Sequence, residues 1–223
     1  MYRKKVAIGL LALLFLTTKS GAQQKPDSFT SFGAYWHNRT SQFRTLPNPD
    51  REICFLGDSI TDGCDWRELT GIERVTNRGI SGDTAWGVLA RLDEVTEGKP
   101  EKIFLMIGTN DLARGKKPME VRDKIAEILD TIRWDSPGTM VFLQSVLPTN
   151  EDMGSGLYVN ANINPLNDLL VKLATDKKVA WVDLRPVFRD DKGKLKRELT
   201  MDGLHLNGQA YYLWYSVIRK YLP

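Results

Sequence analysis

The sequence predicts an α/β fold: a three-layer, doubly wound and mainly parallel sheet of five strands, of the flavodoxin-like type. From residue 51 onward, short apolar runs alternate with amphipathic helical stretches, which is typical of a parallel sheet covered by helices on both faces. The length of 223 residues corresponds to one main domain, which we place at residues 51–223. The alternation leaves the order of the strands open.

Each expected strand is a short apolar run, and each expected helix carries apolar residues on one face. In the helix that begins at Thr84, for example, Val88, Leu92 and Val95 share a face. The expected strands are Ile53–Leu56, Arg74–Asn77, Lys102–Ile107, Thr139–Val146 and Val179–Val182. The expected helices are Thr84–Val95, Val121–Ile132, Asn162–Thr175 and Gly208–Tyr221.

The first 22 residues have the three parts of a secretory signal peptide. Basic residues at Arg3–Lys5 precede an apolar core at Val6–Leu16, and small residues at Ser20–Ala22 supply a cleavage site. An apolar core of 11 residues is too short to span a bilayer. We therefore expect export to the periplasm or the extracellular space, with no stable membrane anchor. Residues 23–50 are expected to form a lead-in to the domain.

The formal net charge of +3 comes from the amino terminus. The first 22 residues hold four basic residues and no acidic ones, so the rest of the chain has 27 basic and 28 acidic residues. A remainder with a net charge of −1 lacks the positive excess that is typical of nucleic-acid binding. We expect no nucleic-acid partner, and no pattern in the sequence indicates an oligomeric state.

The sequence gives no indication of a metal or an organic cofactor. Cys54 and Cys64 have no histidine or further cysteine close in sequence, and we expect two free thiols. No Walker A sequence, Gly-x-Gly-x-x-Gly fingerprint, His-x-x-x-His or Cys-x-x-Cys occurs. The expected chemistry therefore depends on side chains and backbone alone.

Polar, glycine-containing clusters follow three of the expected strands, and a fourth cluster precedes the last expected helix. In an open parallel sheet, ligands bind beyond the carboxyl ends of the strands. We therefore expect all four clusters to meet at one edge. They are Gly57–Ser59, Gly79–Asp83, Gly108–Asp111 and Asp202–His205.

Ser59 is a candidate nucleophile, with His205 as its base. A serine hydroxyl is barely ionised at neutral pH, so it needs a base, and a carboxylate must orient that base. Asp202 lies three residues before His205, close enough to fix the imidazole tautomer. A serine directly after a strand is also a common helix N-cap, and this alternative stays open.

Three groups are candidates for stabilising an oxyanion. They are the Asn110 amide, the Gly82 N–H and the Ser59 N–H at the start of a helix. Ordinary turn or cap roles are the alternatives for Asn110 and Gly82. No Gly-x-Ser-x-Gly occurs, which excludes the nucleophile elbow of the α/β-hydrolases.

With these clusters in this order, the sequence resembles the SGNH/GDSL hydrolase superfamily. Gly-Asp-Ser-Ile at 57–60 matches its serine block, and Gly-Ile-Ser-Gly-Asp at 79–83 matches its glycine block. Gly-Thr-Asn-Asp at 108–111 matches its asparagine block, and Asp-x-x-His at 202–205 matches its histidine block. The surrounding residues are most similar to the branch with platelet-activating-factor acetylhydrolase-like enzymes and secreted bacterial sialate or polysaccharide acetylesterases.

The resemblance implies a role for each candidate residue. Ser59 is the nucleophile, His205 the general base and Asp202 its orienting partner, while Gly82 and Asn110 join Ser59 in the oxyanion hole. The family's donor glycine directly precedes the aspartate of its block, which selects Gly82. The sequence departs mildly from the family at Ser81, where relatives often have glycine.

The resulting hypothesis is a secreted serine esterase that removes short acyl groups, above all acetyl, from a carbohydrate such as sialic acid or a plant or host polysaccharide. Trp36, Trp66 and Trp86 are candidates for stacking on a sugar, with core packing as the alternative for each. Residues Met153–Asn164 are loop-like and are candidates for lining the site, with a plain solvent loop as an equally favoured alternative. The other open hypotheses are a lipid esterase or thioesterase, a non-catalytic carbohydrate-binding module and a flavodoxin-like ligand binder.

Overall fold

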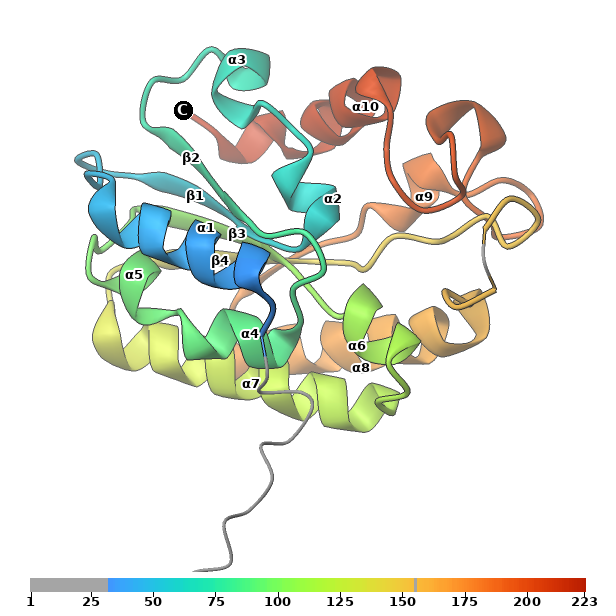
Figure 1. Ribbon diagram of the computed structural model, residues 1–223, viewed down its shortest axis with the longest axis horizontal. Coiled ribbons are helices and arrows are strands. Elements are labelled where there is room, and N and C mark those ends of the chain that lie inside the picture. The colour runs from blue at the N-terminus through green and yellow to red at the C-terminus, as the bar shows by residue number, and fades with distance from the viewer. Residues whose placement is uncertain (1–31, 155) are drawn as a thin grey trace, which may run out of the picture.

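The computed structural model describes residues 32–154 and 156–223 and contains a five-stranded sheet in the order β2-β1-β3-β4-β5 (Figure 1). The strands are β1 (Ile53–Gly57), β2 (Val75–Gly79), β3 (Lys102–Met106), β4 (Met140–Gln144) and β5 (Ala180–Val182). All neighbouring strands run parallel. This is the flavodoxin-like order of a doubly wound sheet, so the predicted fold class is confirmed, and the structure adds the strand order that the sequence left open.

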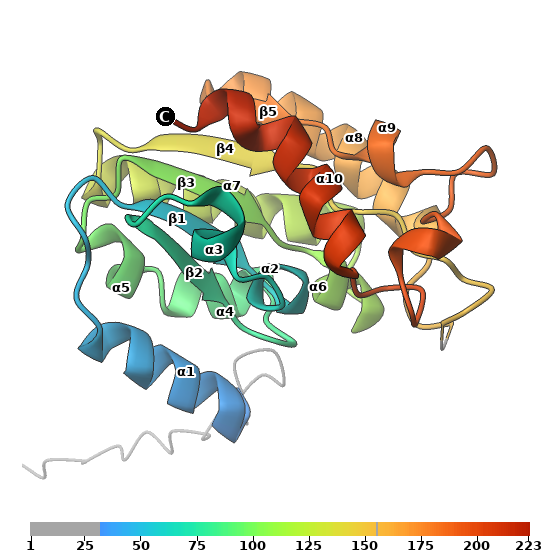
Figure 2. The ribbon, with the colours of Figure 1, turned by 90° about the horizontal axis from the view of Figure 1, so that it is seen from above.

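Helices cover both faces of the sheet (Figures 1 and 2). One face is covered by α4 (Ala85–Ala90), α5 (Asp93–Thr96), α7 (Pro118–Asp135) and α8 (Asn160–Lys177). The other is covered by α2 (Ser59–Asp62), α3 (Trp66–Thr70), α9 (Arg185–Phe188) and α10 (Gly208–Ile218). Helix α1 (Ala34–Thr45) lies outside α5, as Figure 2 shows, and α6 (Thr109–Ala113) follows β3. Short 3-10 helices occupy Arg197–Leu199 and Arg219–Tyr221.

The buried strand residues divide between two cores, because successive side chains of a strand point to opposite faces of the sheet. In β1, Cys54 and Leu56 belong to the core with α7 and α8, whereas Ile53 and Phe55 belong to the core with α10. All four side chains are fully buried. A one-residue slip of β1 would exchange the two sets, so burial on both faces fixes the register.

That register brings the carboxyl ends of three strands to one level. Gly57 at the end of β1 lies opposite Gly79 of β2 and Met106 of β3. A Cβ atom on Gly79 would lie only 2.2 Å from the backbone nitrogen of Asp62 in α2. The end of β2 can therefore pack directly on α2 because this residue is glycine. The loops that follow these strands are held close to one another.

The prediction of a single helix at Thr84–Val95 is wrong. Helix α4 ends at Ala90 and α5 begins at Asp93, and the backbone of Arg91 between them leaves the helical conformation (φ −122°, ψ 13°). The Arg91 guanidinium is fully buried and forms ion pairs with Asp83 and Glu94. Hydrophobic periodicity cannot report this break, because the side chain that turns inward here is charged.

The amino-terminal region contains a helix that the sequence did not predict. Helix α1 lies within the expected lead-in, residues 23–50, and its buried residues are Thr40 and Phe43. These two positions do not form an apolar stripe, so periodicity gave no signal. The predicted signal peptide, residues 1–22, lies outside the described residues. Among the helices of residues 32–154 and 156–223, none combines the length and apolar character that crossing a membrane requires.

Cys54 and Cys64 are free and buried, in agreement with the expected free thiols. Burial raises the pKa of Cys64 to about 12 and that of Cys54 well above its usual value. Both thiols are therefore protonated at neutral pH, which makes them poor nucleophiles and poor metal ligands.

Candidate active site

The four predicted clusters meet at the carboxyl edge of the sheet, with Ser59 as the first residue of α2. The N-cap of this helix is Asp58, whose carboxylate accepts a hydrogen bond of 3.0 Å from the Ile60 backbone N–H. The structure therefore assigns the cap to Asp58 and not to Ser59, whose hydroxyl is available for other contacts.

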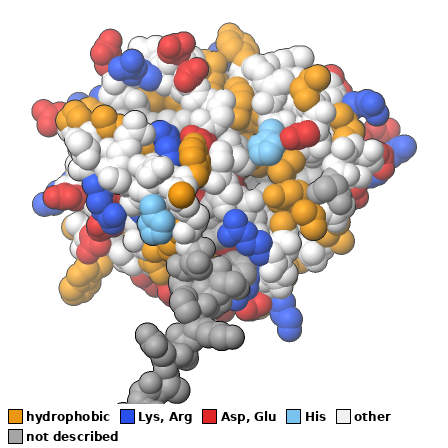
Figure 3. Space-filling view, in the orientation of Figure 1, with side chains coloured by type: hydrophobic (Ala, Val, Ile, Leu, Met, Phe, Trp, Pro, Cys, Tyr) orange, Lys and Arg blue, Asp and Glu red, His pale blue; other side chains and the backbone are white. Residues whose placement is uncertain are grey.

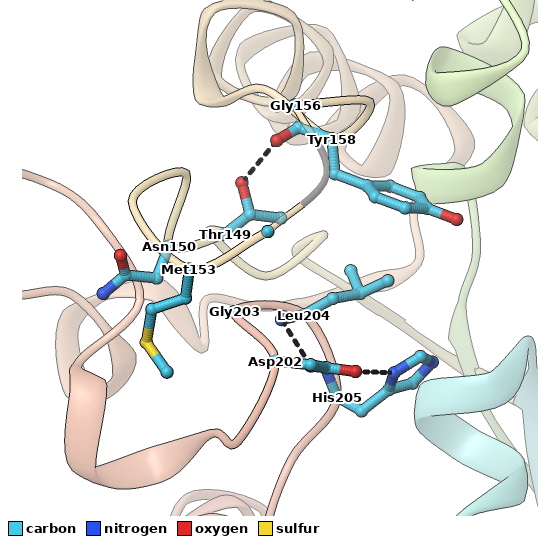
Figure 4. A pocket seen from close by; sticks show the side chains of 10 residues that line it. Thr149, Asn150, Met153, Gly156, Tyr158, Asp202, Gly203, Leu204 and His205 are labelled. Carbon is cyan, nitrogen blue, oxygen red and sulfur yellow. Dashed lines mark hydrogen bonds and ion pairs between the residues drawn. The ribbon is translucent and has the colours of Figure 1, made fainter.

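Ser59, His205 and Asp202 form a continuous hydrogen-bonded series. The Ser59 Oγ lies 3.1 Å from His205 Nε2. His205 Nδ1 lies 2.6 Å from Asp202 Oδ2, a contact that Figure 4 shows. An ionised carboxylate can only accept, so Nδ1 carries the proton and Nε2 is left to accept from the Ser59 hydroxyl. This is the tautomer that a general base requires.

Hydrogen bonds keep Asp202 ionised. Partial burial acts to raise the pKa of this carboxyl, but hydrogen bonds from the His205 side chain and from two backbone N–H groups outweigh it and lower the pKa to about 2. The backbone donors are Leu204 and His205, at 2.9 and 2.8 Å from Asp202 Oδ1. One carboxylate oxygen thus anchors the turn while the other orients the imidazole.

A tight turn allows the acid and base to meet three residues apart. Gly203 lies between them with φ +84°, and its N–H donates to Thr200 Oγ1 at 2.9 Å. A Cβ atom at this position would lie 2.4 Å from the Asn150 carbonyl oxygen. Only glycine combines this left-handed backbone with so close an approach to the neighbouring loop.

The side chains of this series lie at the molecular surface. Figure 3 shows a histidine against an acidic side chain on this face, next to hydrophobic side chains. The His205 and Asp202 side chains are 49 % and 53 % exposed. An ester carried on a bulky alcohol can therefore approach the Ser59 hydroxyl from solvent.

The loop containing Gly82 has one backbone donor without an acceptor among the described residues. Gly82 has φ +77°, a left-handed conformation that favours glycine. The flanking Ser81 N–H donates to Asp62 Oδ2 and the Asp83 N–H donates to the Ile80 carbonyl. Within the described residues, the Gly82 N–H has no acceptor, so it is available to an oxyanion.

Asn110 supplies a second donor from α6. Its Nδ2 donates to the Asp83 carbonyl at 2.9 Å, and its Oδ1 accepts from the Tyr158 hydroxyl at 3.2 Å. An amide nitrogen carries two N–H groups, so one remains for an oxyanion. Ser59, Gly82 and Asn110 are the three residues that the sequence predicted for this hole, and the structure brings their loops together.

Helix α1 reinforces the same loops. Tyr35 donates to Asp62 Oδ2 at 2.9 Å, and Asp62 also accepts from the Ser81 hydroxyl at 2.8 Å. The Trp36 indole N–H donates to Asp83 Oδ1 at 3.1 Å. The segment expected to be only a lead-in therefore contacts both sides of the Gly82 loop.

Buried charged side chains hold the Gly82 loop from the core side. Arg91 donates to Asp83 and Glu94, each at 2.9 Å, and to the Arg78 carbonyl at 2.8 Å. Asp111 accepts from the Ala85 backbone N–H at the start of α4. Burial raises the pKa of Asp111 to about 7. These contacts connect the Gly82 loop to the ends of the strands.

A cavity of about 330 Å³ adjoins His205 (Figure 4). Its walls come from the loop after β4 and from residues 202–205, and they include Met153, Tyr158 and Leu204. The prediction that Met153–Asn164 is a site-lining loop is therefore confirmed for its first part. It is wrong from Asn160 onward, where α8 begins and the side chain of Asn160 accepts from the Thr149 N–H.

Each of the three candidate tryptophans already has a contact on its ring. Trp66 is buried and stacks on Phe55 with ring centroids 3.9 Å apart, so its assignment to a sugar-binding surface is wrong. Trp36 stacks on Phe32 at 4.1 Å. The ring of Trp86 lies under lysine ammonium groups, at 4.8 Å for Lys116 and 5.2 Å for Lys124.

Comparison with known proteins identifies the family of the chain. Residues 55–213 match the GDSL-like Lipase/Acylhydrolase family, and this span contains all five predicted site residues. The chain belongs to this family. The resemblance inferred from the four clusters is thereby confirmed, and the protein is a GDSL-type acylhydrolase.

Curated relatives include the alpha2 subunit of an acetylhydrolase from two organisms. The chain is 30 % identical over 184 residues to platelet-activating factor acetylhydrolase IB subunit alpha2 of Rattus norvegicus, covering 79 % of this chain and 78 % of the relative. It is 32 % identical over 181 residues to the same subunit of Gallus gallus, covering 78 % and 76 %.

Solved structures share the fold. A Streptococcus pneumoniae protein described as a platelet activating factor superposes with a TM-score of 0.77 at 30 % identity, covering 85 % of this chain and 93 % of that one. A GDSL-like lipase from Bacteroides thetaiotaomicron has a TM-score of 0.72 at 23 % identity, covering 83 % and 96 %. The second similarity shows that the GDSL fold persists at low identity.

Three contributors to the site were not predicted. The sequence pattern indicates an exposed helical position for Arg91. Tyr158 lies in a stretch that the pattern identifies only as a loop. Asp62 follows the serine cluster without matching a motif. Only Tyr158 had a usable signal, because its loop was a candidate for lining the site. Among residues 32–154 and 156–223, no group of three histidine, cysteine or acidic side chains is arranged to hold a metal.

Proposed function

We propose that the protein is a serine esterase that hydrolyses short-chain esters, above all acetyl esters. The hydrogen-bonded series Ser59, His205 and Asp202 supports the proposal, since it joins a hydroxyl, a neutral imidazole and an ionised carboxylate. The non-catalytic binding hypothesis gives no reason for such a series beside the loops of Gly82 and Asn110.

In the first step, His205 Nε2 takes the proton of Ser59 as Oγ attacks the ester carbonyl carbon. The carbonyl oxygen becomes an oxyanion, which the N–H groups of Ser59, Gly82 and Asn110 stabilise. Asp202 holds the imidazole in place and stabilises the imidazolium ion that forms. His205 then gives this proton to the leaving alcohol, and the acyl group stays on Ser59.

In the second step, water takes the place of the alcohol. His205 removes a proton from the water, and the resulting nucleophile attacks the acyl carbon. The same donors stabilise the second oxyanion, and His205 returns its proton to Ser59 Oγ as the acid leaves. The cycle needs no metal or organic cofactor.

The relatives favour an acetyl ester of a lipid-like alcohol as the substrate. The similar curated proteins are named as acetylhydrolases of platelet-activating factor. The apolar side chains of Met153 and Leu204 beside His205 support the same choice. The carbohydrate hypothesis loses its aromatic support, because the three candidate tryptophans are buried, stacked or covered.

The site of action belongs to the same proposal. The signal-peptide pattern of residues 1–22 supports export, so we propose a periplasmic or extracellular ester as the substrate.

The decisive experiment measures hydrolysis of p-nitrophenyl acetate, butyrate and octanoate by the protein and by Ser59→Ala. Ser216→Ala on α10 removes an exposed hydroxyl away from the series and is the matched control. We expect acetate to be the best substrate, Ser59→Ala to lose nearly all turnover and the control to keep it. Activity retained in folded Ser59→Ala would contradict the mechanism.

A second comparison identifies the alcohol. Acetylated ether phospholipid and O-acetylated sugars are supplied at equal concentration, and released acetate is measured. Preferential release from the phospholipid supports the proposal, whereas preferential release from the sugar would restore the carbohydrate hypothesis. Octanoate as the best chromogenic substrate would contradict the short-acyl preference.

A further inference from the structure

The donor from Asn110 depends on the orientation of its amide. The oxygen and nitrogen ends of an asparagine side chain are nearly equal in shape, so packing alone does not distinguish the two flipped orientations. One orientation presents an N–H to an oxyanion, whereas the other presents the carbonyl oxygen and repels it. An obligate acceptor at the nitrogen end selects the first orientation, and a donor at the oxygen end holds the amide in it.

The structure supplies both partners. The Asp83 carbonyl can only accept, so it selects Nδ2 at one end, where the hydrogen bond measures 2.9 Å. At the other end, the Tyr158 hydroxyl lies 3.2 Å from Oδ1. The Asn110 side chain is only 6 % exposed, so solvent has little access to replace either partner.

Tyr158 is held in position to act as the donor. Its carbonyl accepts a hydrogen bond of 3.0 Å from Thr149 Oγ1, which ties the tyrosine to the start of the same loop. Figure 4 shows its ring on the wall of the cavity, on the side where His205 lies. Burial raises the pKa of Tyr158 above its usual value of about 10, so the hydroxyl keeps its proton throughout the working range.

We propose that Tyr158 is a positioning residue for the oxyanion hole: its hydroxyl locks the Asn110 amide with one N–H directed at the oxyanion. The inference rests on the proposed function, because it requires an oxyanion to form at Ser59. It gives the loop after β4 a role in the chemistry as well as in lining the cavity.

Removal of the hydroxyl has a defined consequence. Tyr158→Phe keeps the ring on the cavity wall but leaves Oδ1 of a buried amide without a partner. The amide then populates rotated orientations in which its N–H is misdirected, so the effect falls on the transition state and not on substrate binding. We expect kcat to fall about tenfold, as for loss of one neutral hydrogen bond, with KM unchanged.

The experiment compares four variants with p-nitrophenyl acetate. Tyr158→Phe is measured beside Tyr212→Phe, an equivalent change on α10 at a tyrosine that is 66 % exposed. Asn110→Ala and the double variant complete a cycle. Asn110→Ala is expected to lose about 10²–10³ in kcat, as for other oxyanion-hole donors. Because Tyr158 acts through Asn110, the double variant should be no slower than Asn110→Ala alone.

The cycle separates positioning from other roles. A ring or hydroxyl that contacts the substrate would change KM and would add its loss to that of Asn110→Ala. The inference is overturned by unchanged kcat in Tyr158→Phe, by an effect confined to KM, or by full additivity in the double variant. Thermal melting of each variant confirms that the folded protein is being compared.

Failure of the inference is distinguishable from failure of the proposed function. Labelling of Ser59 by a fluorophosphonate provides a second readout, because its phosphoryl oxygen occupies the oxyanion position. Slower labelling of Tyr158→Phe supports the inference. A protein that neither hydrolyses the ester nor is labelled would overturn both proposals, whereas an active protein with unaffected Tyr158→Phe would overturn only the inference.

Discussion

The replacement Asp202→Asn tests the catalytic series with a minimal change in shape. The asparagine oxygen can keep the acceptor position of Asp202 Oδ1, which receives the Leu204 and His205 N–H groups at 2.9 and 2.8 Å. The amide nitrogen then replaces Oδ2, which lies 2.6 Å from His205 Nδ1. Because this nitrogen only donates, Nδ1 must become the acceptor and the ring proton moves to Nε2.

The wrong tautomer removes the base. With a proton on Nε2, the imidazole has no lone pair to accept the Ser59 proton across the 3.1 Å contact. The carboxylate charge that stabilises the imidazolium is lost as well. For the equivalent change in other serine hydrolases the loss is about 10⁴-fold in kcat, or about 5.4 kcal/mol of barrier, and we expect a loss of this order. KM should change little, because Asp202 acts on the His205 imidazole and its replacement by asparagine keeps the shape of the side chain.

The assay is steady-state hydrolysis of p-nitrophenyl acetate, with Asp191→Asn as the control that removes the same charge from an exposed turn. The wild-type pKa of Asp202 is about 2, below its usual value, so this carboxylate stays ionised and its contribution to stability is lost only as pH falls toward 2. Asp202→Asn should therefore reduce activity throughout pH 5–9. Retention of activity within about tenfold of wild type would refute the assignment of Asp202 as the orienting acid.

Three further predictions concern the supports of the site. Gly82→Ala should lower kcat about tenfold and lower the melting temperature by only a few degrees. Its Cβ meets nothing closer than Arg114 at 3.7 Å, so both effects would come from the strained φ of +77°, which redirects the N–H. An unchanged kcat would contradict this. Arg91→Met should lower the free energy of unfolding by about 3–5 kcal/mol, because Asp83 and Glu94 lose their buried partner. A change below about 1 kcal/mol in urea unfolding would contradict this prediction. Burial raises the pKa of the Asp58 carboxyl from 3.8 to about 7, so as the pH rises the unfolded chain loses this proton before the folded protein does. The free energy of unfolding should therefore fall between pH 4 and 7. Asp58→Asn keeps the cap acceptor and should flatten that dependence in urea unfolding measured across this range.

The position of the site was predictable because parallel strands share one direction. Once Ser59, Gly82 and Asn110 each follow a strand of the same parallel sheet, they must lie at the same edge. The order β2-β1-β3-β4-β5 was not predictable, because alternation of strands and helices is the same for every order. The approach of Asp202 to His205 was predictable from spacing alone, since both lie within one turn.

The supports of the site were not predictable for a different reason. Sequence patterns identify buried residues by their apolar character, whereas Arg91 is fully buried because two acidic partners and backbone carbonyls compensate its charge. Those partners come from the loop after β2 and from α5, so the compensation exists only in three dimensions. Helix α1 escaped detection similarly, because polar contacts from Tyr35 and Trp36 fasten it to the domain.

In the proposed mechanism, the same polar contacts hold the oxyanion donors beside an exposed catalytic series. Each of residues 81–83 makes a hydrogen bond outside the loop. The Ser81 hydroxyl donates to Asp62. The Gly82 carbonyl accepts from Arg114, and the Asp83 carbonyl accepts from Asn110. If Gly82 donates to the oxyanion as proposed, these contacts hold its loop in place before the substrate binds, which limits the reorganisation that adds to the barrier. The exposed His205 side chain would then be open to the ester, while the buried ion pairs of Arg91 hold the loop from the core side. The proposed catalytic side chains of His205 and Asp202 therefore lie at the surface, whereas the ion pair of Arg91 with Asp83, which holds the Gly82 loop, lies in the core.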